Sequence, residues 1–451
     1  MKGDNENSSK TIDASPTKEL FISMLIKDIT LIDAIGDLID NSVDGALSIR
    51  PNKDYKELSI KINVNKEVFE IKDNCGGISY EKAKKYAFRF GRSPGTPSLD
   101  HSLGQFGIGM KRALFKIGRS FTIESTSKRD KFKISINVNE WEKDTESWNF
   151  TFQDLYTKEP KDQDFLKDIT GTTIIITDLN PDVKDRFVLD SFTADLIKEI
   201  ELEHLLNIDR GLEIIINGYP LKSHQLLIIN SDQYKPGYWE HQFETGLKVK
   251  AIVGVSESDL QYGGWYIFCN DRLIKGPEQT ITSGWGALKP KSIPKYHNQF
   301  DRFRGYIYFE ATDTSLLPWN TSKNNLDEDS PPYKFVRLNM IDMMRPVIDF
   351  LNKLHQEQSR KITEDKPLLD SLEKSKKDLL SVSNLILQTT SLQREFIYPP
   401  PSKPKPKNEV LISYYKHEKK VNEIMELLGL KNSKEVGERT FDYFYDNECE
   451  G

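Results

Sequence analysis

The chain has 451 residues, of which 37% are hydrophobic and 10% are aromatic, and this is enough for two or three packed domains. A formal net charge of −6 excludes a chain-wide nucleic-acid-binding surface, so any such surface must be a local patch. Three cysteines lie far apart without a CxxC pair, which excludes a disulfide framework or a zinc site and fits a cytoplasmic protein. Since no apolar run reaches about 18 residues, we expect no membrane span.

The first part of the chain is predicted to place helices before strands. Residues 1–16 are polar and are predicted to be disordered. Hydrophobic periodicity then predicts helices over 17–47, 81–90 and 109–117, and strands over 57–65, 68–72, 120–127, 131–139, 148–154 and 172–178. The segment 91–103 holds too many glycines and prolines for a regular element. Helices that cover one face of a sheet favour an α/β sandwich over residues 17–187.

A second domain is predicted over residues 188–354. Its pattern is a helix at 191–206, strands at 212–217, 246–255, 264–269 and 304–309, and a helix at 333–354. Residues 355–398 are charged and helical, and leucines at 368, 372, 379 and 385 fit either a short coiled coil or a packed amphipathic helix. Residues 399–408 form a stiff Pro/Lys linker. The tail, 409–451, has two short helices and is too small to be stable alone, so it is expected to dock on a protein partner or dimerise.

The helix at 33–47 carries the first chemical signal. Asp37, Asn41 and Asp44 recur at helical spacing, while the opposite side of the helix is apolar. Oxygen ligands of this kind suit Mg²⁺, which usually takes one or two protein ligands together with substrate phosphates. The alternative is an ordinary solvated acidic face.

Three further motifs follow at characteristic spacing. Asp73-Asn74-Cys75-Gly76-Gly77-Ile78 ends a predicted strand, Gly104-Gln105-Phe106-Gly107-Ile108-Gly109-Met110-Lys111 opens a helix, and Gly171-Thr172 begins a strand. Each is a common turn or loop when taken alone. Together with the motif at 37–45, these motifs occur in an order that resembles the GHKL ATPase superfamily over residues 17–185. The sequence of residues 34–42 is most similar to bacterial MORC-like ATPases. The resemblance implies an α+β architecture: a Bergerat-type ATP-binding sandwich, an S5-like α/β transducer domain and a helical C-terminal region.

The glycine motif is the expected phosphate-binding element. Glycines before a helix N-terminus allow close backbone approach and present N–H groups to phosphate. In the family this segment, Gly104 to Gly109, ends the mobile ATP lid, which would be residues 91–103, and wraps the triphosphate. The alternative is a tight strand-to-helix turn.

The resemblance assigns the adenine-binding residues. Asp73 would accept a hydrogen bond from the adenine amino group, Gly77 and Ile78 would pass close to the base, and the Thr172 hydroxyl would help to hold Asp73 and a water molecule. This chain departs from the family at Cys75, where glycine is commoner, so we expect a slightly altered turn.

The resemblance also assigns the catalytic residues. Asn41 would bind Mg²⁺, and Asp37 stands where most relatives have a glutamate that activates water. The shorter acid predicts slow hydrolysis, and Asp40 or Asp44 would share the role or order water. Lys323 matches the transducer lysine that reaches the γ-phosphate, with an exposed loop lysine as the alternative. Lys111 is a lesser candidate for phosphate contact.

The leading functional interpretation is an ATP-driven homodimeric clamp that acts on DNA or on a protein, with bacterial DNA restriction or defence as an analogy. Lysines and arginines at 289–304, interleaved with Trp285, Tyr296 and Phe303, fit either a nucleic-acid-binding patch or a solvated loop. A non-hydrolysing nucleotide switch and a chaperone are alternatives. A histidine kinase is disfavoured, because no phosphoacceptor helix precedes the ATP-binding motifs.

Overall fold

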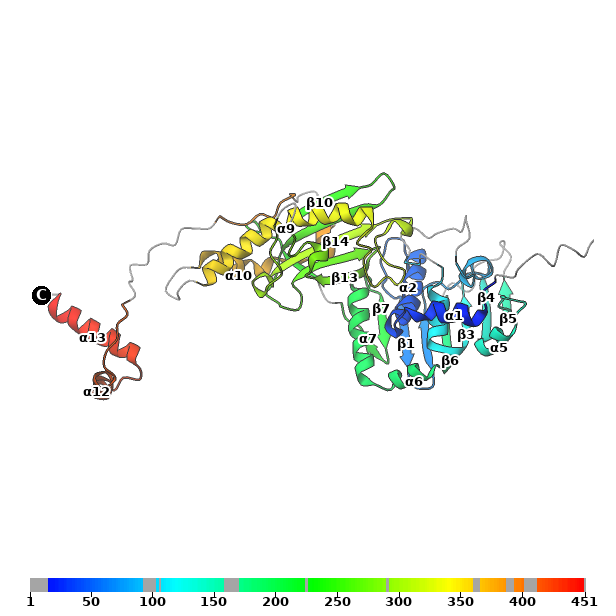
Figure 1. The fold of residues 1–451 in the computed structure, drawn as a ribbon, viewed down its shortest axis with the longest axis horizontal. Coiled ribbons are helices and arrows are strands. Elements are labelled where there is room, and N and C mark those ends of the chain that lie inside the picture. Colours follow the sequence, from blue (N-terminus) through cyan, green and yellow to red (C-terminus); the bar gives the residue numbers. More distant parts are fainter. Residues whose placement is uncertain are drawn as a thin grey trace, which may run out of the picture. The chain divides into compact units, whose positions relative to one another are not determined.

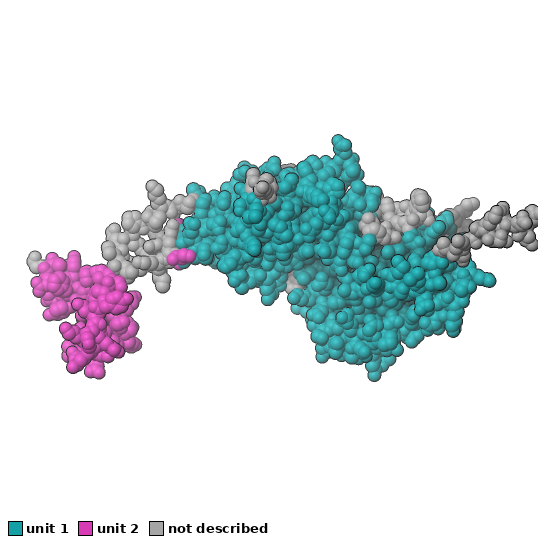
Figure 2. Space-filling view, in the orientation of Figure 1, with its two compact units in different colours: residues 1–358, 368–401 teal, residues 359–367, 402–451 magenta. Residues whose placement is uncertain are grey.

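A computed structural model of the chain describes residues 15–91, 103–104, 107–157, 170–223, 226–288, 292–359, 366–386, 393–400 and 412–449. The chain divides into two compact units, one of residues 1–358 and 368–401 and the other of residues 359–367 and 402–451 (Figure 2). Among the described residues, no helix combines the length and the apolar character needed to cross a membrane.

The first sheet belongs to the N-terminal part of the chain (Figure 1). Within the described residues its strands run in the order β5 (Phe152–Thr157), β4 (Asp130–Asn137), β3 (Gly118–Thr126), β6 (Gly171–Leu179), β2 (Phe69–Asp73), β1 (Ser59–Val64), β7 (Glu213–Ile216) and β8 (Tyr219–Pro220). Neighbouring strands are antiparallel except β1 and β7, which are parallel. The strand expected to belong to the second domain, at 212–217, therefore extends the first sheet.

Helices cover the apolar face of this sheet. Alternate residues of β1 are buried while their neighbours are exposed, as expected for a sheet with one covered face. The helices of this part are α1 (Lys18–Lys27), α2 (Leu31–Ile49), α3 (Tyr80–Lys82) with a π-helical continuation (Ala83–Ala87), α4 (Gly109–Ile117), α5 (Val138–Lys143), α6 (Pro181–Phe187), α7 (Asp190–Glu203) and α8 (Leu205–Asp209). Where one helix was expected over 17–47 there are two, because Thr30 caps α2 in a capping box with Asp33.

The second sheet is buried on both faces. Its order within the described residues is β10 (Gly237–Gln242), β11 (Lys248–Val255), β14 (Phe303–Glu310), β12 (Gly264–Cys269) and β13 (Arg272–Glu278). All six residues of β12 are buried. The side chains of β12 point alternately into two separate cores. Trp265 and Ile267 face the core that includes α9 (Pro331–Gln358), while Tyr266 and Phe268 pack with α8.

Residues 366–386 fold back onto the second sheet rather than continuing as one long helix. They form α10 (Pro367–Lys374), a 3₁₀ turn, β15 (Leu379–Ser381) and α11 (Val382–Ile386), and β15 pairs with β9 (Leu227–Ile229). Leu368, Leu372 and Leu385 are buried in the cores. Of the two alternatives for this segment, packing on the domain therefore replaces the coiled coil.

The C-terminal unit is a helical hairpin. The two helices are α12 (Glu418–Leu428) and α13 (Ser433–Glu448), with Gly429 in the left-handed conformation at the end of α12 and Asn432 as the cap of α13. Among the described residues of this unit only Val436 is a buried hydrophobic residue. The hairpin thus lacks a core of its own, as the sequence predicts.

Candidate functional site

Two acids of α2, Asp37 and Asp40, lie on a buried side of that helix. Asp37 and Asp40 are both buried, although charged side chains seldom are unless they are paired. Their partners come from other elements of the same unit: Arg112 from α4, Arg272 from β13 and Lys323 from the loop before α9. The helix therefore carries part of a buried charge cluster, which the alternative of a solvated acidic face does not describe.

Lys323 bridges the two carboxylates. Its Nζ lies 3.1 Å from Asp37 Oδ1 and 2.5 Å from Asp40 Oδ2. Because Lys323 is buried and doubly paired, the alternative of an exposed loop lysine is excluded for this structure. Burial opposes its charge, but the carboxylates of Asp40 and Asp37 outweigh burial and raise the pKa of Lys323.

Arginines hold the remaining oxygens of the two carboxylates. Arg112 Nε donates to Asp37 Oδ2 at 2.6 Å, and Arg272 Nη1 donates to Asp40 Oδ1 at 2.5 Å. Burial alone would raise the pKa of Asp40, but the charges of Arg272 and Lys323 hold that pKa well below its usual range. Asp40 is therefore a permanently ionised anchor for the second sheet.

Arg272 extends the cluster to the end of α7. Its Nη2 donates to Glu203 Oε1 at 2.8 Å. Burial raises the pKa of Glu203 to about 8, against the lowering effect of Arg272, and burial lowers the pKa of the neighbouring His204 to about 3, so that ring is neutral. Sequence reasoning missed Arg112, Arg272 and Glu203, since nothing in their local spacing indicates a shared site.

The glycine loop is tied to α2 through Asp44. Asp44 accepts hydrogen bonds from the backbone N–H of Leu103 at 2.6 Å and of Gly104 at 2.9 Å. At the other end of the loop, a Cβ on Gly109 would lie 3.1 Å from Asp37 Oδ1, a tight contact that would require Asp37 to shift slightly. The predicted lid residues 92–102 and the loop residues Gln105 and Phe106 lie outside the described residues.

Lys111 forms hydrogen bonds to two backbone carbonyl groups. Its ammonium group is buried and donates to the carbonyl oxygens of Ala87, at 2.9 Å, and of Gly107. Gly107 itself has a φ of +65°, a conformation that glycine adopts without strain. These bonds favour a role for Lys111 in shaping the loop, next to Ile108, which caps α4.

Asp44 predicts a pH-dependent contribution to stability. Burial raises its pKa to about 6, against the lowering effect of the two N–H groups. The unfolded chain loses this proton near its ordinary value, so ionisation of the folded protein costs stability between that value and pH 6, and the full cost persists above it. Because Asp44 is only partly buried, we expect about 1–2 kcal/mol.

The free energy of unfolding of Asp44→Asn should therefore rise relative to that of wild type as the pH increases from about 4.5 to about 8. Urea unfolding at both pH values measures this change. Asp329→Asn is the control, because its side chain is 96% exposed. A stability difference between Asp44→Asn and wild type that is the same at both pH values would contradict the account.

Asp73 lies at the end of β2, where the sequence predicts the adenine-binding acid. Its Oδ1 accepts from the N–H of Cys75 at 2.8 Å and of Thr172 at 3.2 Å, and its Oδ2 accepts from the Ser42 hydroxyl at 2.8 Å. Burial raises its pKa. The backbone of Thr172, and not its hydroxyl, thus holds Asp73; the hydroxyl lies 3.0 Å from that of Ser125.

The turn after Asp73 explains how cysteine is accommodated. The left-handed conformations fall on Gly76 and Gly77, with φ of +97° and +67°, while Cys75 is not among the residues with positive φ. A Cβ on Gly77 would lie 2.1 Å from the Thr126 carbonyl oxygen, so only glycine fits there. The next residue, Ile78, donates its N–H to the Ser125 hydroxyl at 2.7 Å.

Asn41, the predicted magnesium ligand, forms a hydrogen bond that uses only its amide nitrogen. It is exposed on α2, and its amide nitrogen donates to the Asp37 carbonyl at 2.7 Å, a bond that does not use the amide oxygen. Among the described residues no group of three or more His, Cys, Asp or Glu side chains could hold a metal by itself. One amide oxygen is what Mg²⁺ needs when substrate phosphates supply further ligands.

Of the basic residues predicted to form a patch at 289–304, the two arginines are buried, whereas Lys295 is exposed. Arg302 and Arg304 are buried. Arg302 pairs with Glu373 at 2.8 Å, and Arg304 donates to the backbone carbonyl oxygens of Glu257, Asp301 and Phe303. Trp285 and Phe303 are also buried. Lys289 and Lys291 lie outside the described residues. These arginines and aromatic residues support the fold and are not free to bind nucleic acid.

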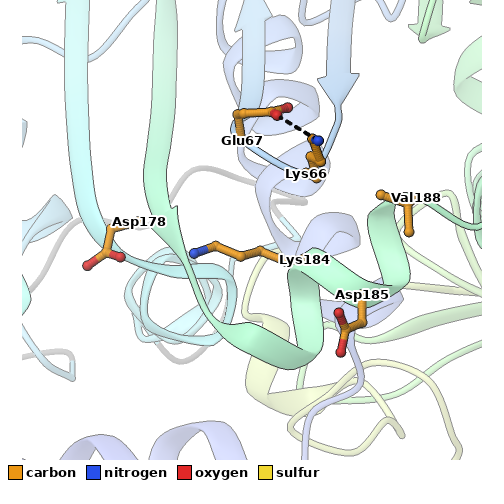
Figure 3. Close-up of a pocket in the computed structure, with 6 residues that line it drawn as sticks. All are labelled: Lys66, Glu67, Asp178, Lys184, Asp185 and Val188. Atoms are coloured by element: carbon orange, nitrogen blue, oxygen red, sulfur yellow. Dashed lines mark ion pairs between the residues drawn. The ribbon is translucent and has the colours of Figure 1, made fainter.

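An open hollow lies at the opposite end of the first sheet (Figure 3). Its lining includes Glu67, which precedes β2, and Asp178, near the end of β6. Asp73 and Thr172 lie at the other ends of the same two strands. None of the residues that line the hollow belongs to the charge cluster, and its ion pair Lys66–Glu67, at 3.6 Å, is exposed.

Comparison with known proteins agrees with this geometry. No curated protein matches the chain. Residues 29–172 match the family model described as "Histidine kinase-, DNA gyrase B-, and HSP90-like ATPase". The matched segment contains α2, the turn after Asp73, the glycine loop and the beginning of β6. Residues 29–172 are therefore similar to this family of ATPase domains.

Proposed function

We propose that the chain binds ATP with Mg²⁺ and hydrolyses it slowly, and that the second sheet responds to the γ-phosphate through Lys323. The observation that carries the proposal is the contact between Asp37 of the matched segment and Lys323, 286 residues later, beside Gly109. A buried lysine between two carboxylates is a cation that a triphosphate can attract, and such a cation stabilises charge on a transferring phosphoryl group.

The base-binding end favours adenine. Asp73 Oδ2 accepts one hydrogen bond, from Ser42, and a carboxylate oxygen has room for a second donor. Adenine offers an amino group at the position where guanine offers a carbonyl oxygen. A carboxylate therefore accepts from adenine and repels guanine.

Asn41 would hold the magnesium ion together with the phosphates, and the ion would neutralise phosphate charge. The residues of the chain have separate tasks: Asp44 ties down the glycine loop, Asp73 orients the base, and Asp37 accepts a proton from the attacking water. Slow turnover is expected because Asp37 is short and because both of its oxygens are already occupied by cations.

The test is hydrolysis of ATP and GTP under single-turnover conditions, with Mg²⁺ and with EDTA. We expect hydrolysis of ATP that needs Mg²⁺ and little hydrolysis of GTP. Equal rates for the two nucleotides, or no hydrolysis of either, would contradict the proposal.

The larger assembly that we propose is an ATP-dependent homodimer acting as a clamp. Light scattering after size exclusion should give a dimer with a non-hydrolysable ATP analogue and a monomer with ADP. A protein partner is favoured over DNA, because Arg302 and Arg304 are buried and the net charge is −6. DNA binding that weakens steeply with salt would reverse that preference.

The second candidate function is a nucleotide-gated switch without turnover. The saturation of both Asp37 oxygens favours it, since a carboxylate held by two cations is a poor base. ATP-dependent dimerisation in the absence of any hydrolysis would select this function over the first.

A further inference from the structure

The ion pairs of Asp37 and Asp40 in the charge cluster follow a regular arrangement. Each of the two carboxylates gives one oxygen to Lys323 and the other to an arginine: Asp37 to Arg112, and Asp40 to Arg272. All five side chains are buried. Lys323 is therefore a counter-ion shared by both acids, while each arginine serves only one of the two.

The shared cation and the arginine of Asp37 come from different parts of the fold. Arg112 lies on α4, one turn after Gly109, and α4 packs against α2, so Arg112 and Asp37 belong to one helix pair. Lys323 belongs to a loop outside the matched segment and has a φ of +56°. This left-handed conformation is unfavourable for a non-glycine residue, and the ion pairs help to hold Lys323 in it.

We propose that Arg112 is a positioning residue that keeps Asp37 Oδ2 fixed, so that Asp37 Oδ1 becomes the proton-accepting oxygen when Lys323 turns towards ATP. The assignment rests on the proposed ATPase function. In the step it serves, the water oxygen bonds to the γ-phosphorus and one water proton passes to Asp37 Oδ1. The bond from the γ-phosphorus to the β–γ bridging oxygen breaks, and its electron pair leaves with ADP.

The energetic reason lies in burial. A buried carboxylate without any cationic partner is strongly destabilising. Without Arg112, the departure of Lys323 from Asp37 would therefore be opposed. Arg112 remains at 2.6 Å and prevents this, and it also fixes the direction in which the free oxygen points. Arg272 does the same for Asp40 at 2.5 Å.

The test compares Arg112→Gln and Arg112→Lys with wild type in steady-state ATP hydrolysis. We expect kcat to fall about 10²-fold in Arg112→Gln, because misplacement of a reacting group by about 1 Å has that effect, while KM for ATP stays nearly constant. Arg112→Lys keeps the charge and should recover part of kcat. The control is Arg119→Gln, which breaks a partly exposed ion pair with Glu142 and should leave kcat unchanged.

ADP affinity and the thermal midpoint separate positioning from folding. A fall in kcat at constant ADP affinity supports the assignment; wild-type kcat in both Arg112 variants overturns it. If Arg112→Gln does not fold, Arg112→Lys decides by the same two criteria. Absence of hydrolysis in wild type overturns the proposed function and this assignment together, whereas hydrolysis that depends on Asp37 but not on Arg112 overturns this assignment alone.

Discussion

Asp37→Asn should lower the single-turnover rate of ATP hydrolysis by about 10³-fold, within the range expected for removal of a general base. The amide has the same shape as the carboxylate but cannot take the water proton. Its oxygen can still accept from Arg112, and Lys323 keeps Asp40 as a partner, so the variant should fold and bind ATP. The loss should therefore appear in the chemical step and not in the affinity.

Asp37→Glu and Asp329→Asn complete this experiment. The glutamate keeps a carboxylate, so we expect it to retain more activity than the amide, although its extra methylene disturbs the match to Arg112 and Lys323. Asp329→Asn changes an exposed acid and should hydrolyse at the wild-type rate. If Asp37→Asn turns over as fast as wild type, Asp37 is not the base.

Arg272→Met should have the largest effect on stability. Arg272 is 1% exposed and pairs with two carboxylates, and loss of one partner of a buried pair usually costs about 3–5 kcal/mol. We expect the lower end, about 3 kcal/mol, because Glu203, with a pKa of about 8, already carries a proton at pH 7 and Asp40 keeps Lys323.

Urea unfolding at pH 7 measures this loss. Arg119→Met is the matched control, since its ion pair at 2.9 Å is partly exposed and pairs of this kind contribute about 1 kcal/mol or less. An equal loss in the two variants would show that the cluster contributes no more than a surface pair.

The sequence predicted the parts of the site that lie within short motifs. The helix with Asp37 and Asn41, the turn after Asp73, the strand beginning at Gly171 and the helix after Gly109 all appear close to the expected positions. These features follow from local hydrophobic periodicity and from glycine positions, both of which can be read in a single sequence. The match of residues 29–172 to the family model agrees with the superfamily resemblance.

The charge cluster could not be predicted in the same way. Arg112 and Arg272 lie 75 and 232 residues from the acids that they bind, and no local pattern records such pairs. Nor could the burial of Arg302 and Arg304 be predicted from the basic segment at 289–304, because it depends on the tertiary fold. The segment with leucines at 368–385 was expected to be helical, but within it β15 pairs with β9, and this tertiary contact overrides the helical pattern.

We propose that residues 29–172 form an ATP site in which Asp73 selects adenine. Calorimetric titration of the intact chain with ATP in the presence of Mg²⁺, beside Asp73→Asn, tests it most directly. In that variant the amide can still accept from the N–H groups of Cys75 and Thr172, so the fold should persist. The account predicts one ATP per wild-type chain and affinity at least about tenfold weaker in Asp73→Asn; no binding to wild type, or equal binding to both proteins, would contradict it.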